Sequence, residues 1–110
     1  MHPSKRKGDD AERDVEKLLR ALLDVPARRK LGAGRLDDMG DIDNVPDTVI
    51  SVGNIARLSE AIREKPVECE VQRVRAGARF AATFVKLRGG KYRVVLTVEQ
   101  FAALWKAAQK

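Results

Sequence analysis

Apolar residues recur along this chain at the three-to-four-residue spacing of amphipathic helices in four segments. The segments are residues 9–23, residues 54–64, a stretch that starts at Pro66, and the stretch after Thr97. Thr97-Val98-Glu99-Gln100 is a capping box, which predicts that Thr97 caps the start of the last helix. The third helix is expected to bury Val67, Val71, Val74 and Ala78, and the fourth to bury Phe101, Leu104, Trp105 and Ala108. For Phe101 and Trp105 the alternative is a dimer surface.

Runs of β-branched and aromatic residues predict five strands, at 28–31, 41–45, 48–52, 80–87 and 92–96. Gly89-Gly90 between the last two is typical of a hairpin turn. The predicted order is therefore αβββααββα, a single mixed α/β domain over residues 9–110. Residues 1–8 are expected to form a flexible basic tail.

Composition narrows the class of protein. The 110 residues, 44% of them hydrophobic, suffice for one modest core. Cys69 is the sole cysteine, so no internal disulfide is expected and a reducing cytoplasm fits. No run approaches the roughly 20 apolar residues that span a bilayer, and no apolar signal-peptide stretch follows the N-terminus. A cytoplasmic protein without a membrane partner is expected.

The charge is unevenly distributed and points to a polyanion partner. Residues 1–35 hold ten Lys or Arg against six Asp or Glu, residues 36–70 three against nine, and residues 71–110 nine against one. Basic flanks neutralise phosphates, and clustered carboxylates near phosphate commonly share a divalent metal. A nucleic acid is therefore the expected partner, and the alternative is that these charges are simply solvated.

Three stretches carry the candidate chemistry. The first is Lys5-Arg6-Lys7-Gly8 followed by Ala11-Glu12-Arg13, and the second is Arg28-Arg29 followed by Gly40-Asp41-Ile42. The third is the strand Val49-Ile50-Ser51-Val52-Gly53-Asn54 with the helical stretch 70–78. In this order and spacing they resemble the PD-(D/E)XK nuclease superfamily, most closely its small Holliday-junction-resolvase-like proteins of archaea and phages.

The resemblance implies a single restriction-endonuclease-like domain with a mixed central sheet flanked by helices. It also implies a homodimer that acts on DNA, including four-way junctions, with Mg²⁺ or Mn²⁺ as cofactor, and it suits a phage-encoded protein in the host cytoplasm. Glu12 matches the catalytic glutamate of the first helix, and Asp41 matches the metal-binding aspartate. Ser51 and Gly53 stand at the Glu and Lys positions of the E-x-K strand.

Serine is a poor Mg²⁺ ligand and glycine supplies neither base nor charge, so we expect a catalytically degenerate, DNA-binding nuclease fold that needs no metal. One alternative is an active endonuclease with a relocated site. In that case Asp41 and Asp43 would bind the metal, Glu60 or Glu64 would supply a carboxylate, and Lys65 or Lys86 the base. The other alternative is a protein-interaction module. Asp41 also has a purely structural interpretation, as an acid that caps the turn before a strand.

Two sets of basic residues are candidates for phosphate contacts. The set near the predicted cleft comprises Lys5, Arg6, Lys7, Arg28, Arg29, Lys30 and Arg35. The second set comprises Arg73, Arg75, Arg79, Lys86, Arg88, Lys91 and Arg93.

Overall fold

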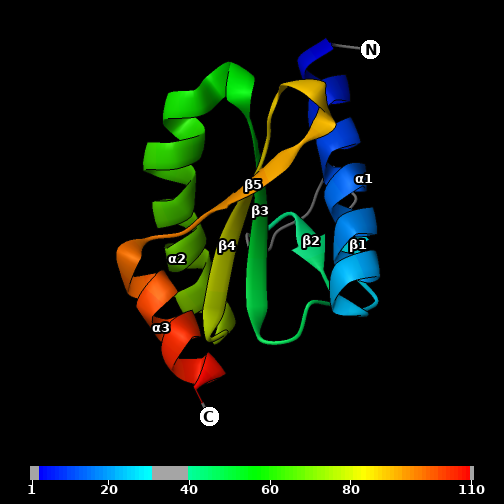
Figure 1. Cartoon of the computed structure of the whole chain (residues 1–110). Helices are drawn as coiled ribbons and strands as arrows, with labels where there is room; N and C mark the ends of the chain where they lie inside the picture. The colour runs from blue at the N-terminus through cyan, green and yellow to red at the C-terminus, as the bar shows by residue number, and fades with distance from the viewer. Residues whose placement is uncertain (1–2, 31–39, 110) are drawn as a thin grey trace.

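A computed structural model describes residues 3–30 and 40–109, with side chains in the first helix from residue 10 onward. The described residues form a five-stranded mixed sheet and three α-helices (Figure 1). The elements are α1 (Pro3–Leu23), β1 (Arg28–Arg29), β2 (Ile42–Asp43), β3 (Thr48–Asn54), α2 (Lys65–Ala76), β4 (Phe80–Lys86), β5 (Tyr92–Val95) and α3 (Val98–Ala108). The predicted mixed α/β class is confirmed.

The sheet has the strand order β1-β2-β3-β4-β5. Strands β1, β2 and β3 pair antiparallel, β3 and β4 pair parallel, and β4 and β5 pair antiparallel. The parallel pair requires a crossover, which α2 supplies. β3 extends two residues further than predicted, so that Gly53 and Asn54 belong to the strand.

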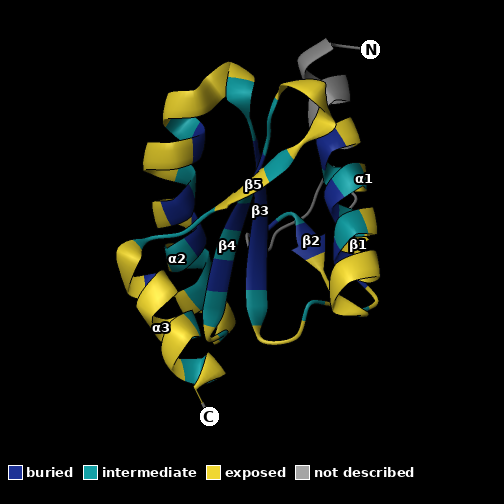
Figure 2. Cartoon of the chain, viewed as in Figure 1, coloured by how far each residue is buried: buried dark blue, intermediate teal, exposed yellow. Residues whose placement is uncertain are grey.

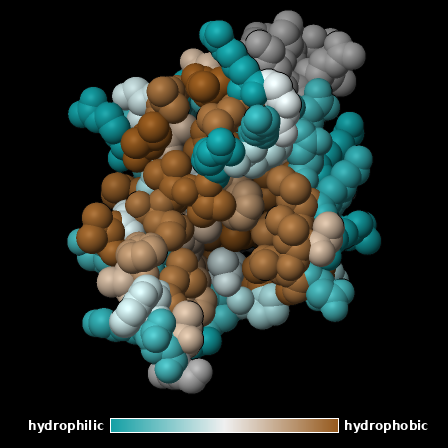
Figure 3. Space-filling view, in the orientation of Figure 1, coloured by the Kyte–Doolittle hydropathy of each residue, from teal (hydrophilic) through white to brown (hydrophobic). Residues whose placement is uncertain are grey.

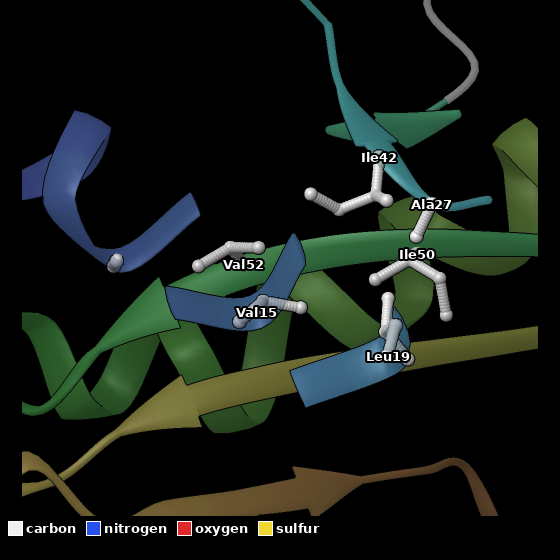
Figure 4. Packing of buried hydrophobic residues seen from close by; sticks show 7 residues of the cluster. Val15, Leu19, Ala27, Ile42, Ile50 and Val52 are labelled. Atoms are coloured by element: carbon white, nitrogen blue, oxygen red, sulfur yellow. The ribbon is translucent and has the colours of Figure 1, made fainter. Parts of the chain in front are cut away.

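β3 is buried on both faces because α1 covers one face and α2 the other (Figure 2). Ala11, Val15 and Leu19 follow one another at four-residue spacing along α1 and are all buried. They pack with Ile50 and Val52 of β3 (Figure 4). The odd-numbered residues of β3 point the other way, and Val49 packs against Cys69 of α2.

α1 begins at Pro3, six residues before the predicted start at residue 9. It therefore includes residues 3–8, which the sequence analysis placed in a tail. The apolar stripe of α1 extends beyond the buried core at Leu22, which is 75% exposed. The side chains of Lys5, Arg6 and Lys7 lie outside the described part of the chain.

The helical conformation predicted over 54–64 is confirmed for residues 55–64, but its separation from the helix that follows is wrong. A 3₁₀ turn (Ile55–Arg57) is followed by a π-helical turn (Glu60–Glu64) that runs directly into α2. Pro66 is the physical reason, since it has no N–H and its ring clashes with the carbonyl four residues before it. The Lys65 N–H bonds to the Glu60 carbonyl, five residues back, and this wider turn accommodates the proline.

Two predicted buried stripes are wrong for most of their members, although Ala78 and Leu104 are half-buried. Val67, Val71 and Val74 are 56%, 48% and 67% exposed, because α2 packs on the sheet through Pro66 and Cys69 instead. In α3, Phe101 and Trp105 are 59% and 55% exposed. The predicted N-cap of α3 is confirmed: the Thr97 hydroxyl accepts a hydrogen bond from the Gln100 N–H.

Candidate functional site

Ser51, at the expected Glu position, faces α2 and lies inside the core. The register of β3 and β4 places it opposite Thr83, and the two hydroxyl oxygens are 2.9 Å apart. Ser51 is 7% exposed and Thr83 0%. This buried pair satisfies both hydroxyl groups, as buried polar atoms require, and leaves no opening through which Ser51 could reach a substrate.

Gly53, at the expected Lys position, is covered by side chains from the next helical segment. A Cβ atom at this position would lie 3.0 Å from the Cβ of Ala61 and 3.4 Å from the Cδ of Lys65. The first of these distances is shorter than ordinary carbon–carbon contact at about 3.5–4.0 Å. The space in which the family lysine would begin is therefore occupied by Ala61 and by the stem of Lys65.

Asp41 extends the pairing of the short strand β2 with β3. Its N–H donates to the Ile50 carbonyl at 2.7 Å, and its Oδ2 accepts from the Val52 N–H at 2.8 Å. Its own carbonyl accepts from the Lys30 N–H at 2.9 Å. The Asp41 carboxylate thus accepts the β3 N–H that a carbonyl of the neighbouring strand would otherwise accept. This is a structural role.

We expect Asp41→Ala to lower the free energy of unfolding by about 1–3 kcal/mol, because the Val52 N–H then has no protein acceptor in this partly buried place. Asp41→Asn keeps an oxygen in the same position and is expected to lose less than half of that. Urea unfolding of both variants measures the difference. Equal losses would mean that the charge of Asp41, and not its role as acceptor, matters for stability.

Asp43, the second predicted metal ligand, points to the β1 side. Its Oδ1 lies 3.4 Å from the Nζ of Lys30, whose side chain is only 5% exposed. Among the described residues no group of three or more His, Cys, Asp or Glu is arranged to hold a metal ion. Since Asp41 accepts from Val52 and Asp43 pairs with Lys30, the two carboxylates do not fit the expected Mg²⁺ or Mn²⁺ site.

A cavity of about 220 Å³ opens at the carboxyl end of β3. It brings together several of the residues that the sequence singled out, namely Glu12 of α1, Gly53 of β3, Glu60 and Lys65. Glu60 carries an ion pair to Arg57 at 3.3 Å. Glu64 is exposed and does not line this cavity.

A second cavity, of about 450 Å³, shares Asn54 and Ala56 with the first. Its lining continues along the β4–β5 hairpin through Lys86, Arg88 and Gly90. The two cavities together are called the end groove below, and its charged lining residues are Asp10, Glu12, Arg57, Glu60, Lys65, Lys86 and Arg88. Four of these seven are cationic.

A polar network that sequence analysis missed adjoins the end groove. The Tyr92 hydroxyl donates to Asp14 Oδ2 at 2.8 Å, and Lys86 Nζ lies 3.4 Å from the same oxygen. Burial, with the neighbouring Asp14 carboxylate, raises the pKa of Tyr92 far above its usual value. Lys86, a candidate replacement base, is thus engaged with Asp14. No short-range pattern could have revealed these contacts, since Asp14 and Tyr92 are 78 positions apart.

The basic residues near the predicted cleft are only partly available. Arg28 is exposed on β1, whereas Lys30 is withdrawn into its ion pair with Asp43. Arg29 donates its N–H to Glu16 at 2.8 Å and is half-buried. Arg35 lies outside the described residues.

The Cys69 thiol is buried under α2 and makes sulfur hydrogen bonds to the carbonyls of Val49 and Ala82. Burial raises the pKa of this thiol. A thiol that stays protonated at neutral pH is a poor nucleophile and metal ligand. In this environment Cys69 serves as a small packing residue.

Comparisons with protein-family models, with curated proteins and with solved structures gave no match for this chain. In the described part of the chain no helix has the length and apolar character needed to cross a membrane.

Proposed function

We propose that this protein binds DNA through a resolvase-like nuclease fold whose catalytic strand is degenerate. The order of elements supports it: a helix, an antiparallel three-stranded meander, a crossover helix and two further strands. These are a mixed sheet and flanking helices of the kind that the PD-(D/E)XK resemblance implies.

One observation carries the degenerate part of the proposal. Ser51 is paired with Thr83 in the core, and Ala61 lies over Gly53. The Ser51 hydroxyl is thus used for packing inside the core. Gly53 contributes only backbone to the wall of the cavity of about 220 Å³, where Ala61 and the stem of Lys65 cover it. Neither position presents a catalytic group to that cavity.

The binding part rests on the β4–β5 hairpin and the end groove. Arg88 and Lys91 are exposed on the hairpin, and its two glycines have positive φ angles of 79° and 76° with nothing within 4 Å of an added Cβ. An open, basic hairpin beside a groove can approach a phosphate backbone closely. Phosphate contacts of this kind give shape-dependent rather than base-specific binding.

We expect the protein to bind a labelled four-way junction and a matched duplex without cleaving either, in Mg²⁺, in Mn²⁺ or with chelator. The affinity should fall steeply as salt rises, because each phosphate contact releases counterions. Arg88→Ala is expected to lower the slope of log K against log salt by about 1. Lys106→Ala, in the last turn of α3 at the far end of the molecule, is the matched control (Figure 1).

An affinity for DNA that does not depend on salt, or no affinity at all, would contradict the proposal and favour a protein-interaction module. Equal effects of Arg88→Ala and Lys106→Ala would exclude the hairpin as the binding surface.

A second candidate, an endonuclease with a relocated site, is favoured by one observation. Glu12, Glu60 and Lys65 line one cavity, and Lys65 stands over Gly53. Cleavage of the junction that disappears in Lys65→Ala but persists in Lys106→Ala would establish it in place of the first proposal.

A further inference from the structure

The last helix packs against β4 of its own chain along a narrow face only, with Leu104 and Ala107 half-buried. Of the eleven residues of α3, all of which the structure describes, Gln100 alone is buried, and its Nε2 has no hydrogen-bond partner. Val98, Phe101 and Trp105 are 79%, 59% and 55% exposed and form one stripe at spacings of three and four. An isolated helix of this length is marginal in water, because most helical stability comes from packing of an apolar face.

A groove without an occupant lies on the same molecule, between α1 and β5. Its volume is about 810 Å³, and Leu18, Leu22, Phe84, Tyr92 and Val94 contribute to its lining. Leu22 is 75% and Val94 50% exposed. Figure 3 shows apolar side chains gathered on this face, from the α2 and α3 side across β5 to the lower half of α1.

α3 cannot fill this groove in its own chain. Two residues, Leu96 and Thr97, connect β5 to α3. α3 therefore starts at the end of β5 that is remote from the hairpin, whereas the groove follows Gly90 to Val94 beside α1 (Figure 1).

We propose that a second copy of this chain docks here, with α3 of each copy lying in the α1–β5 groove of the other. In a two-fold dimer the same contact forms twice, so that α3 and the groove of both copies are covered at once. The proposal does not rest on DNA binding.

The exposed apolar area agrees with this occupant. The stripe of α3 together with Leu22 and Val94 offers roughly 400 Å² of apolar side-chain surface, by the areas expected of aliphatic and aromatic side chains. A standard interface buries about 800 Å² on each partner, of which about 65% is apolar in homodimers. The two contacts of the dimer thus supply most of the apolar area that a stable homodimer needs.

The mass of the full chain in solution, from light scattering at about 50 μM, is expected to be that of a dimer. Trp105→Glu in the stripe and Leu22→Glu in the groove should each weaken the dimer by about 30-fold or more, as a central contact would. Val67→Glu is the matched control, because it places the same charge on an exposed apolar position of α2. Circular dichroism checks that each variant is folded.

Mixing the two disruptive variants separates this arrangement from other dimers. A heterodimer of Trp105→Glu with Leu22→Glu keeps one unaltered α3-in-groove contact, whereas either homodimer keeps none. The mixture should therefore associate more tightly than either variant alone. A monomeric wild-type chain, a dimer as sensitive to Val67→Glu as to Trp105→Glu, or a mixture no tighter than its components would overturn the proposal.

Discussion

The double substitution Ser51→Glu with Gly53→Lys, which introduces the family's expected catalytic pair into β3, is expected to unfold the domain and not to create a nuclease. Ser51 is 7% exposed and its partner Thr83 is fully buried, so a glutamate at 51 would place an unpaired carboxylate in the core. An uncompensated buried charge costs about 3–5 kcal/mol. Gly53→Lys adds overpacking against Ala61, at about 1–3 kcal/mol.

The sum is comparable to the whole stability of an ordinary domain, about 5–15 kcal/mol. Urea unfolding, followed by circular dichroism, should therefore show a large fall in the midpoint for Ser51→Glu alone and no folded baseline for the double variant.

Ser51→Ala is the matched control, because it removes the hydroxyl group without adding volume or charge. It is expected to lose about 1–3 kcal/mol, because the buried Thr83 hydroxyl then loses its partner. A Ser51→Glu variant as stable as Ser51→Ala would show that position 51 is open to solvent. A folded double variant that cleaves DNA would show that the site is intact apart from its two missing groups.

Features that depend on near neighbours in the chain could be predicted from the sequence. The Thr97 cap and the Gly89-Gly90 turn are read from adjacent residues, and both are found in the structure. The alternation along β3 and β4 likewise depends on backbone geometry alone. These features specify where the last strands and the last helix begin and end, and which residues of a strand share a face.

The faces that helices bury could not be predicted in the same way. The valines of α2 form a regular stripe, but Pro66 and Cys69 on another side of the helix contact the sheet. A stripe shows that a helix has an apolar side. It does not show whether the same chain covers that side, because this depends on where neighbouring elements leave space.

The candidate site, too, could be predicted from the sequence only in part. The family resemblance was enough to single out positions 41, 51 and 53, and Lys65 and Lys86 were the two candidate replacements for the missing lysine. It could not show that Lys65 lies over Gly53, because the π-turn before Pro66 determines where Ala61 and Lys65 fall. The Ser51–Thr83 pair depends on the register between two strands 32 positions apart.

Gly40→Ala, at a buried glycine, is expected to lower the free energy of unfolding by about 2–4 kcal/mol, a large effect for so conservative a change. Gly40 has a φ of +94°, which side chains rarely adopt, and a Cβ here would lie 2.6 Å from the Ile50 carbonyl oxygen. That oxygen accepts the Asp41 N–H, so relief of the clash must break the pairing of Asp41 with β3. Gly40 is thus the residue that allows Asp41 to approach the strand.

Gly77→Ala separates backbone strain from this close approach. Gly77 ends α2 with a φ of +69°, and nothing lies within 4 Å of an added Cβ. Its substitution should lose only the strain of a left-handed residue, about 1 kcal/mol. Urea unfolding of the two variants therefore measures the steric contribution at Gly40 as a difference. If the two losses were equal, contact with the Ile50 carbonyl would contribute nothing, and the need for glycine before Asp41 would be conformational alone.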